Sequence, residues 1–283
     1  MAPARILHLS DLHVGKREEP ELGPALAALV AELGPELVVA SGDLTHRGRS
    51  EQHEQAHAFL TGLGPPVLAV PGNHDIPYTF PARFTSSWAE FERLWGTTEP
   101  VHSSPAFHVV GLNSVRPWRH QSGGVQADAL ERASARLAEA PEGALRVAVL
   151  HHHLLGAPWR TRKRPVARRD EVLTALAAAG AQLILGGHTH QGEVGERRDF
   201  VGAAAAEPTL VAATAPGLGL PRPHRSGEAR GLLVHETDGH TLTVRSFVWR
   251  REGWTETATR AFPLATSRSR ASSFVSKTAR WSA

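Results

Sequence analysis

The sequence predicts an α/β fold built from two sheets, and three observations support this prediction. Short apolar segments alternate with segments of helical periodicity before residue 192. The remainder changes to strand-like segments joined by turns rich in glycine and proline, which predicts a second sheet of antiparallel strands. A chain of 283 residues with 41% hydrophobic and 21% charged residues is long and apolar enough for one large globular domain.

The first sheet is predicted from six apolar segments of strand length. They span residues 5–10, 36–41, 66–71, 106–113, 145–151 and 182–187. Near-continuous apolar runs of this length are typical of strands that are buried on both faces. Because helical segments separate them, we expect parallel βαβ units with helices on both faces of the sheet.

The helices are predicted from apolar residues spaced three and four apart. Five segments have this spacing, namely 24–33, 51–63, 88–95, 127–140 and 169–180. Gly34, followed by Pro35, and Gly180 are the expected helix stops.

The second sheet is predicted from strands at 209–214, 230–236 and 241–249. Residues 1–264 are therefore expected to form one domain. The last segment, 265–283, is rich in serine and arginine and is predicted to be a flexible tail.

Composition excludes several kinds of protein. The chain has no cysteine, so any metal must be held by nitrogen and oxygen ligands. The apolar run near the N-terminus is too short for a signal peptide, and Glu207, Pro208 and Pro216 interrupt the most apolar later stretch. We therefore expect a cytoplasmic protein without a membrane span.

Candidate metal ligands and proton donors follow five of the predicted strands. In α/β sheets, ligands bind beyond the carboxyl ends of the strands. The residues found there are Asp11, His13, Asp43, Asn73, His74, Asp75, His151, His152, His153, His188 and His190. Each motif alone is compatible with an ordinary turn, but chance is a poor explanation for five of them that follow strands in order.

These ligands exceed what a single metal ion needs. Imidazole and carboxylate donors without sulfur suit Mn²⁺, Fe, Zn²⁺, Co²⁺ or Ni²⁺. A carboxylate such as Asp43 can bridge two ions roughly 3.5–4 Å apart. If residues 188–190 are extended, His188 and His190 point to the same side. The sequence thus predicts a site for two divalent metal ions.

The motifs DLH, GDLTHRG, GNHD, HHH and GGHTH, in that order, resemble the five signature motifs of the calcineurin-like metallophosphoesterase superfamily. The resemblance implies two sets of ligands, one of Asp11, His13, Asp43 and His190 and the other of Asp43, Asn73, His151 and His188. It implies that His74 is a catalytic residue that is not a ligand, and that Asp75 orients it. The fourth motif departs from the family pattern because no proline follows, which leaves His151 and His152 as alternatives. His151 is favoured because it directly follows the apolar run LRVAVL.

The resemblance also implies the mechanism and the architecture. A hydroxide that bridges the two metals attacks phosphorus in line, and His74 assists the departure of the alkoxide. We expect a four-layer α/β/β/α sandwich of two mixed sheets, with the dinuclear metal site at the carboxyl ends of the strands.

Substrate contacts are expected from the loops 76–105 and 114–125 and from the basic segment 159–169. The candidates are His46, Trp118, Arg119, His120, His152 and Arg160. A small anionic phosphoester is the expected partner. The basic segment leaves nucleic acid or an anionic membrane surface as alternative partners.

Within the superfamily, RILHLSDLHVG, GDLTHRG, VPGNHDIP and GLNS most resemble the bacterial class III cyclic-nucleotide phosphodiesterases. This favours 3′,5′-cyclic nucleotides as substrates. One alternative is a UDP-2,3-diacylglucosamine pyrophosphatase that acts on a lipid A precursor, although that group usually has GNRD in place of GNHD. The others are a DNA nuclease and a catalytically silent scaffold on the same fold, although such scaffolds typically lose ligands that are present here.

Overall fold

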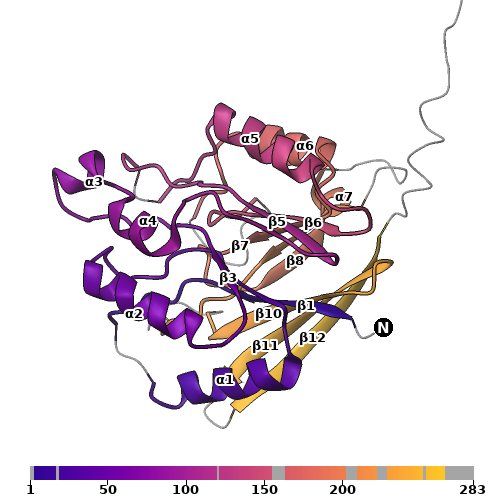
Figure 1. Cartoon of the computed structure of the whole chain (residues 1–283), viewed down its shortest axis with the longest axis horizontal. Helices are drawn as coiled ribbons and strands as arrows, with labels where there is room; N and C mark the ends of the chain where they lie inside the picture. Colours follow the sequence, from indigo (N-terminus) through magenta and orange to yellow (C-terminus); the bar gives the residue numbers. More distant parts are fainter. Residues whose placement is uncertain are drawn as a thin grey trace, which may run out of the picture.

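The computed structural model describes residues 3–16, 19–119, 121–154, 163–201, 209–221, 228–250 and 253–264. It contains two six-stranded sheets packed face to face, with helices on the outside of each (Figure 1). This is the four-layer α/β/β/α sandwich expected from the sequence. Residues 265–283, predicted to be a flexible tail, lie outside the described part of the chain.

The first sheet has the strand order β12-β11-β10-β1-β2-β3. The strands β1 (Ala4–Leu9), β2 (Leu37–Ala40) and β3 (Val67–Ala69) are parallel, and β3 forms one edge of the sheet. The strands β10 (Gly231–Thr237), β11 (Thr241–Arg250) and β12 (Gly253–Pro263) extend it in antiparallel fashion from β1.

The second sheet has the strand order β4-β5-β6-β7-β9-β8. The strands β5 (Phe107–Gly111), β6 (Leu145–Val149), β7 (Leu183–Gly186) and β9 (Val211–Thr214) are parallel. Short antiparallel strands, β4 (Val101–Ser103) and β8 (Glu193–Glu196), form its two edges.

The expectation that the C-terminal strands form a separate antiparallel sheet is wrong. β10 and β11 join the first sheet, whereas β9 pairs with β7 in parallel in the second. All four residues of β9 are buried, which is typical of an internal parallel strand and not of a half-exposed antiparallel one. Each sheet also has helices on one face only, because its other face packs against the other sheet.

The longer helices lie close to their predicted ranges. They are α1 (Leu22–Leu33), α2 (Ser50–Thr61), α4 (Ala89–Trp95), α5 (Ala127–Ala138) and α6 (Arg169–Ala178). Gly34 ends α1 in the left-handed conformation, with φ of 56°. Two short helices, α3 (Ala82–Thr85) and α7 (Arg197–Val201), were not predicted.

Three layers of buried apolar side chains hold the four layers of the fold together. Ile6 and Val39 of the first sheet pack against Phe107 and Val147 of the second. A second apolar layer lies between the first sheet and α1 and α2, and a third lies between the second sheet and α5 and α6. Among the described residues, no helix is both long and apolar enough to span a bilayer.

Candidate metal centre

The backbone at five of the seven candidate ligands adopts an uncommon conformation. Asp11, His13, Asp43, His188 and His190 have positive φ values of 51°, 51°, 53°, 72° and 62°. Such a conformation at a residue other than glycine costs about 1–3 kcal/mol and is concentrated at functional sites. The expectation that residues 188–190 are extended is therefore wrong. His188 and His190 face the site because each has a left-handed backbone, and not because alternate residues of a strand point to the same side.

One group of ligand atoms comes from the loop after β1 and the loop after β7. His190 Nε2 lies 3.1 Å from Asp11 Oδ1 and 3.2 Å from His13 Nε2. His13 Nε2 is 3.8 Å from the same carboxylate oxygen. All three residues are buried, and their ligand atoms lie within 4.8 Å of one another. Three donors around one point are the beginning of a metal coordination sphere.

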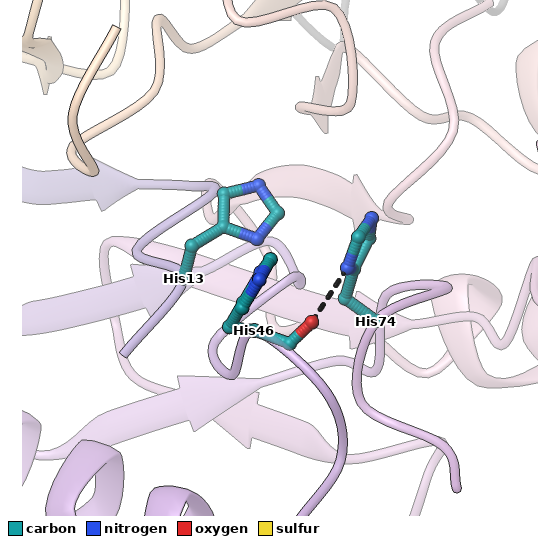
Figure 2. A group of neighbouring side chains, drawn as sticks. All are labelled: His13, His46 and His74. Carbon is teal, nitrogen blue, oxygen red and sulfur yellow. Dashed lines mark hydrogen bonds between the residues drawn. The ribbon is translucent and has the colours of Figure 1, made fainter. Parts of the chain in front are cut away.

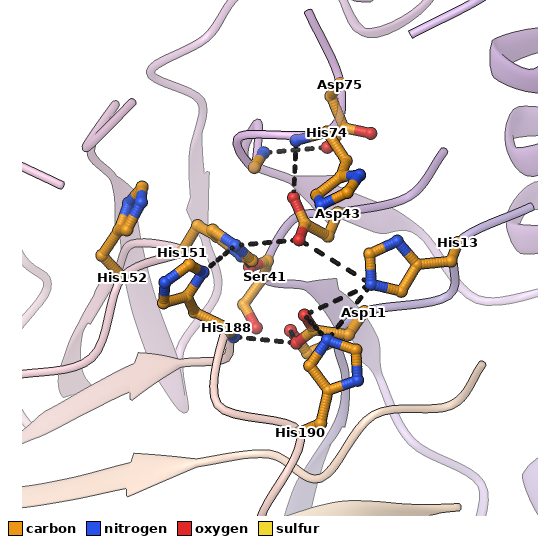
Figure 3. A network of polar contacts seen from close by, with 12 residues as sticks. Asp11, His13, Ser41, Asp43, His74, Asp75, His151, His152, His188 and His190 are labelled. Carbon is orange, nitrogen blue, oxygen red and sulfur yellow. Dashed lines mark hydrogen bonds and ion pairs between the residues drawn. The ribbon is translucent and has the colours of Figure 1, made fainter. Parts of the chain in front are cut away.

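A second group combines Asp43, His151 and His188 (Figure 3). His151 Nε2 lies 3.4 Å from Asp43 Oδ2 and 3.2 Å from His188 Nδ1. The other nitrogen of each ring donates a hydrogen bond to a backbone carbonyl, His151 Nδ1 to Ser41 and His188 Nε2 to Gln121. These bonds fix the tautomers and leave the lone pairs facing the centre of the group.

Asp43 connects the two groups. Its Oδ2 atom lies 3.4 Å from His151 Nε2 in one and 3.8 Å from His13 Nε2 in the other. Its Oδ1 atom accepts a hydrogen bond from the backbone N–H of His74. One carboxylate oxygen is thus held by the backbone, and the other is presented between two sets of imidazoles.

Three buried oxygens of the site have no hydrogen-bond partner within the described part of the chain, namely Asp11 Oδ1, Asp43 Oδ2 and Asn73 Oδ1. An unsatisfied buried polar atom is costly, and a buried carboxylate oxygen is more so. These oxygens converge with the imidazole nitrogens of the site, which is the pattern of donor atoms that a metal cation satisfies. The donor set therefore fits divalent metal ions.

The charges within the site are strongly coupled. Burial alone would raise the pKa of Asp43, but the neighbouring His151 holds this pKa well below its usual range. Burial opposes protonation of His151, but Asp43 and Asp11 raise the pKa of that imidazole to about 9. Burial lowers the pKa of His13 to about 3 despite the same carboxylates. The carboxylates are therefore ionised, and His151 carries a proton when no metal is bound.

His74 lies beside the two groups and belongs to neither of the buried ligand sets. Its Nδ1–H donates to the backbone carbonyl of His46, 2.8 Å away (Figure 2). Its ring centroid lies 4.7 Å from that of His13 in an edge-to-face arrangement. With Nδ1 held by a carbonyl, Nε2 is the atom available for proton transfer.

Asp75 does not contact the His74 ring through any hydrogen bond among the described residues. Its carboxylate accepts the backbone N–H groups of Leu44, Thr45 and Gly72. It therefore fixes the loop after β2 against the loop after β3. The orienting contact that was expected from Asp75 is made by the His46 carbonyl.

The candidate substrate contacts are divided between two places. His46 lies at the site, with its ring centroid 6.0 Å from that of His74. His152 lies outside the network, with Nδ1 2.9 Å from Ser114 Oγ (Figure 3), so the structure brings His151 rather than His152 into the ligand group. Trp118 and Arg119 are exposed on a neighbouring loop. His120 and Arg160 lie outside the described residues.

Sequence reasoning missed several residues that support the site. Ser10 Oγ donates to Asp11 Oδ2, and the Ser41 and Gln121 carbonyls orient two imidazoles. Lys163 Nζ lies 3.4 Å from His188 Nδ1. A backbone carbonyl is present at every residue, so its contacts cannot be predicted from the type of side chain. Lys163 was considered only as part of the basic segment 159–169.

The fold and the buried His/Asp groups define a metallophosphoesterase, and comparison with protein families agrees. The calcineurin-like phosphoesterase family matches residues 4–192, so the chain belongs to that family. Membership and the donor set together imply divalent metal ions.

Among curated proteins, the chain is 29% identical over 199 residues to a "probable cyclic nucleotide phosphodiesterase" of Synechococcus sp., covering 66% of this chain and 73% of that protein. It is 32% identical over 80 residues to the glycerophosphodiester phosphodiesterase GpdQ of Enterobacter lignolyticus, covering 25% of this chain and 29% of that protein. Among solved structures, purple acid phosphatase PPD1 of yellow lupin has the same fold, with a TM-score of 0.71 and 12% identity. That match covers 99% of this chain and 57% of the lupin chain.

Proposed function

We propose that this protein is a phosphodiesterase that uses two divalent metal ions. The observation that carries the proposal is the position of Asp43 Oδ2 between His13 and His151, at 3.8 and 3.4 Å. One metal would be held by Asp11, His13, Asp43 and His190, and the other by Asp43, Asn73, His151 and His188. Bound ions of this kind supply an activated water and neutralise the charge on phosphoryl oxygens.

The protein's own groups perform the remaining steps. His74 gives a proton from Nε2 to the leaving alkoxide. Its Nδ1–H bond to the His46 carbonyl keeps the ring in one orientation during the transfer. His46, half-buried beside it, contacts the part of the substrate that departs. The Asp75 carboxylate holds the two loops that carry Asp43 and His74 in register.

Cyclic nucleotides are the proposed substrates. The similarity to the Synechococcus protein, whose name gives that activity, extends over 66% of this chain and supports this choice. GpdQ, named for another phosphodiester activity, supports the bond type but not the nucleotide. The retention of His74 and of every proposed ligand argues against a catalytically silent scaffold.

The test is hydrolysis by the purified full chain reconstituted with Mn²⁺. Four substrates are compared, namely bis(p-nitrophenyl) phosphate, p-nitrophenyl phosphate, cAMP and a UDP-linked pyrophosphate. We expect turnover of the first and third in preference to the monoester and the pyrophosphate. Preference for the pyrophosphate would replace the cyclic-nucleotide assignment with the lipid-precursor reaction, and metal binding without any turnover would count against an enzyme.

A further inference from the structure

A cavity lies beside the metal centre and is lined by different residues; we call it the second cavity. Its volume is about 290 Å³, and its lining includes Trp118 and three arginines, Arg116, Arg119 and Arg168. None of these residues belongs to the metal ligands. Arg168 is part of the basic segment 159–169, to which the proposed reaction gives no role.

The floor of this cavity is a fixed part of the fold. The Ala167 N–H donates to the Gly123 carbonyl at 3.0 Å, and the Gly124 N–H donates to the Ser114 carbonyl at 2.9 Å. Arg116 lies against this floor, because a Cβ atom on Gly124 would be 3.1 Å from Arg116 Nε. The segment before α6 is therefore tied to the loop that carries Arg116 and Trp118.

The three guanidinium groups are only partly balanced by negative charge, because Asp128 acts on Arg116 and Glu171 pairs with Arg168. Among the described residues, Arg116 and Arg119 form no ion pair, and Arg168 has an exposed pair with Glu171 at 3.3 Å. Burial, together with repulsion from Arg119 and Arg168, lowers the pKa of Arg116. Like charges gathered in a cavity repel one another unless an anion joins them. Guanidinium groups bind phosphate through paired, charge-assisted hydrogen bonds.

Trp118 adds a flat apolar surface to this cationic cavity. Its indole stacks on Phe84 with centroids 5.5 Å apart and an interplanar angle of 5°, yet 72% of the residue is exposed. Phe84 covers one face of the ring, so the other face is open. An open aromatic face beside guanidinium groups is a combination used to stack nucleobases while holding their phosphates.

The cavity is one side chain away from the metal centre. Gly123 lines it, and a Cβ atom on Gly123 would lie 2.2 Å from the His152 ring. The His152 ring centroid is 4.5 Å from that of His188. A molecule bound in the cavity is therefore close to the metal ligands but does not displace them.

We infer that this cavity binds a nucleotide, with its phosphate on Arg116, Arg119 and Arg168 and its base against Trp118. This site is separate from the metal centre and does not depend on the proposed hydrolysis. Two independent features of the cavity point to the same ligand, namely the three gathered guanidinium groups and the exposed indole that stacks on Phe84.

The test measures binding of 5′-AMP to the full chain by calorimetry. Asp43→Asn keeps the oxygen that accepts the His74 N–H but weakens the metal centre, so binding that remains in this variant reports the second cavity. We expect Asp43→Asn to bind one AMP. Adding Arg116→Gln or Arg168→Gln should then raise Kd about tenfold or more, the effect of losing a hydrogen bond to a charged group. Arg93→Gln, which removes a paired surface arginine elsewhere, is the matched control.

Two further probes separate the base from the phosphate. Trp118→Ala should weaken AMP about tenfold, as expected for loss of one stacking contact, and should leave the binding of ribose 5-phosphate unchanged. Adenosine, which has no phosphate, should bind far more weakly than AMP. Complete loss of AMP binding in Asp43→Asn, or an unchanged Kd in both arginine variants, would overturn the inference whether or not the protein hydrolyses phosphodiesters.

Discussion

Asp43 Oδ2 lies 3.4 Å from His151 Nε2, and the two residues come from different sheets. Asp43 follows β2 of the first sheet, and His151 follows β6 of the second. The metal centre is therefore complete only when the two sheets have packed together. The carboxylate and the imidazole attract each other across that interface, which couples assembly of the site to assembly of the core.

Replacing Asp43 by asparagine should weaken both metal positions. The amide keeps the shape and the Oδ1 acceptor but removes the charge between the two imidazole groups. Loss of an outer-shell partner costs roughly 10–100-fold in metal affinity, and loss of a shared ligand should cost at least as much. Metal content after dialysis, measured by mass spectrometry, should fall at both positions. Asp128→Asn on the surface of α5 is the control, and loss of one ion only would mean that Asp43 does not bridge.

Replacing His74 by alanine should spare metal content and lower kcat. General acid catalysis contributes about 10²–10⁴-fold, so a loss in that range is expected for cAMP, whose leaving group is an alkoxide. The loss should be smaller for bis(p-nitrophenyl) phosphate, because p-nitrophenolate leaves without a proton. Equal losses on both substrates would contradict proton donation by His74. His240→Ala, at an exposed turn, is the matched control.

Metal affinity should depend on pH through His151. Asp43 and Asp11 outweigh the effect of burial and raise its pKa to about 9, so the metal-free site holds a proton on this imidazole at neutral pH. A metal ion needs the neutral ring and must displace that proton. Affinity should therefore rise as pH increases towards 9 and level off above it. Calorimetry in two buffers of different ionisation enthalpy measures the released proton, and His151→Asn should release one proton fewer.

The histidines and carboxylates of the site could be predicted because each follows an apolar strand. The gathering of Asp11, Asp43, His151 and His188 depended on the rule that ligands bind beyond strand ends. The left-handed backbone at Asp11, Asp43 and His188 could not be predicted, because contacts made by the packed sheets hold it in place and these contacts are not visible in the sequence. The role expected of Asp75 failed for a related reason, since backbone N–H donors are not visible in a side-chain pattern.

The sheet that each C-terminal strand joins could not be predicted either. β9 and β10 both contain consecutive buried apolar residues, and that pattern does not say which sheet accepts a strand. β12 was missed because most of its side chains are exposed and polar, although it pairs with β11 along its length. Partner choice depends on contacts far apart in sequence, which local periodicity does not contain.

A buried pair of histidines should make folding stability depend on pH. His235 Nε2 lies 3.3 Å from His8 Nδ1, and both residues are fully buried in the first sheet. Burial lowers the pKa of His235 to about 3 and that of His8 well below its usual value. In the unfolded chain both rings titrate near 6.5. The unfolded state therefore binds more protons below about pH 6.5, and the free energy of unfolding should fall as pH decreases from there towards 3, by up to about 1.4 kcal/mol per pH unit for each ring.

Denaturant titrations at pH 7.5, 6 and 5 measure this dependence in the wild type and in His235→Gln. The variant should lose less stability on acidification than the wild type, because one of the two buried rings is gone. His240→Gln should behave as the wild type does, since that ring is exposed. An identical slope in the wild type and His235→Gln would show that His235 does not remain neutral in the folded chain.

Two glycine substitutions should have opposite effects. A Cβ atom on Gly72 would lie 2.1 Å from the Asp43 backbone nitrogen and 2.3 Å from Asp43 Oδ1, so Gly72→Ala must displace the bridging carboxylate. Gly23 lies inside α1, where a Cβ atom would meet only Phe59 at 3.6 Å, an ordinary contact. Gly23 lies in the first turn and precedes Pro24, so Gly23→Ala should stabilise the fold only slightly, by up to about 0.5 kcal/mol. Gly72→Ala should lose bound metal and thermal stability together. Full metal content in Gly72→Ala would mean that the two loops can separate without disturbing Asp43, which the hydrogen bond from the Gly72 N–H to Asp75 argues against.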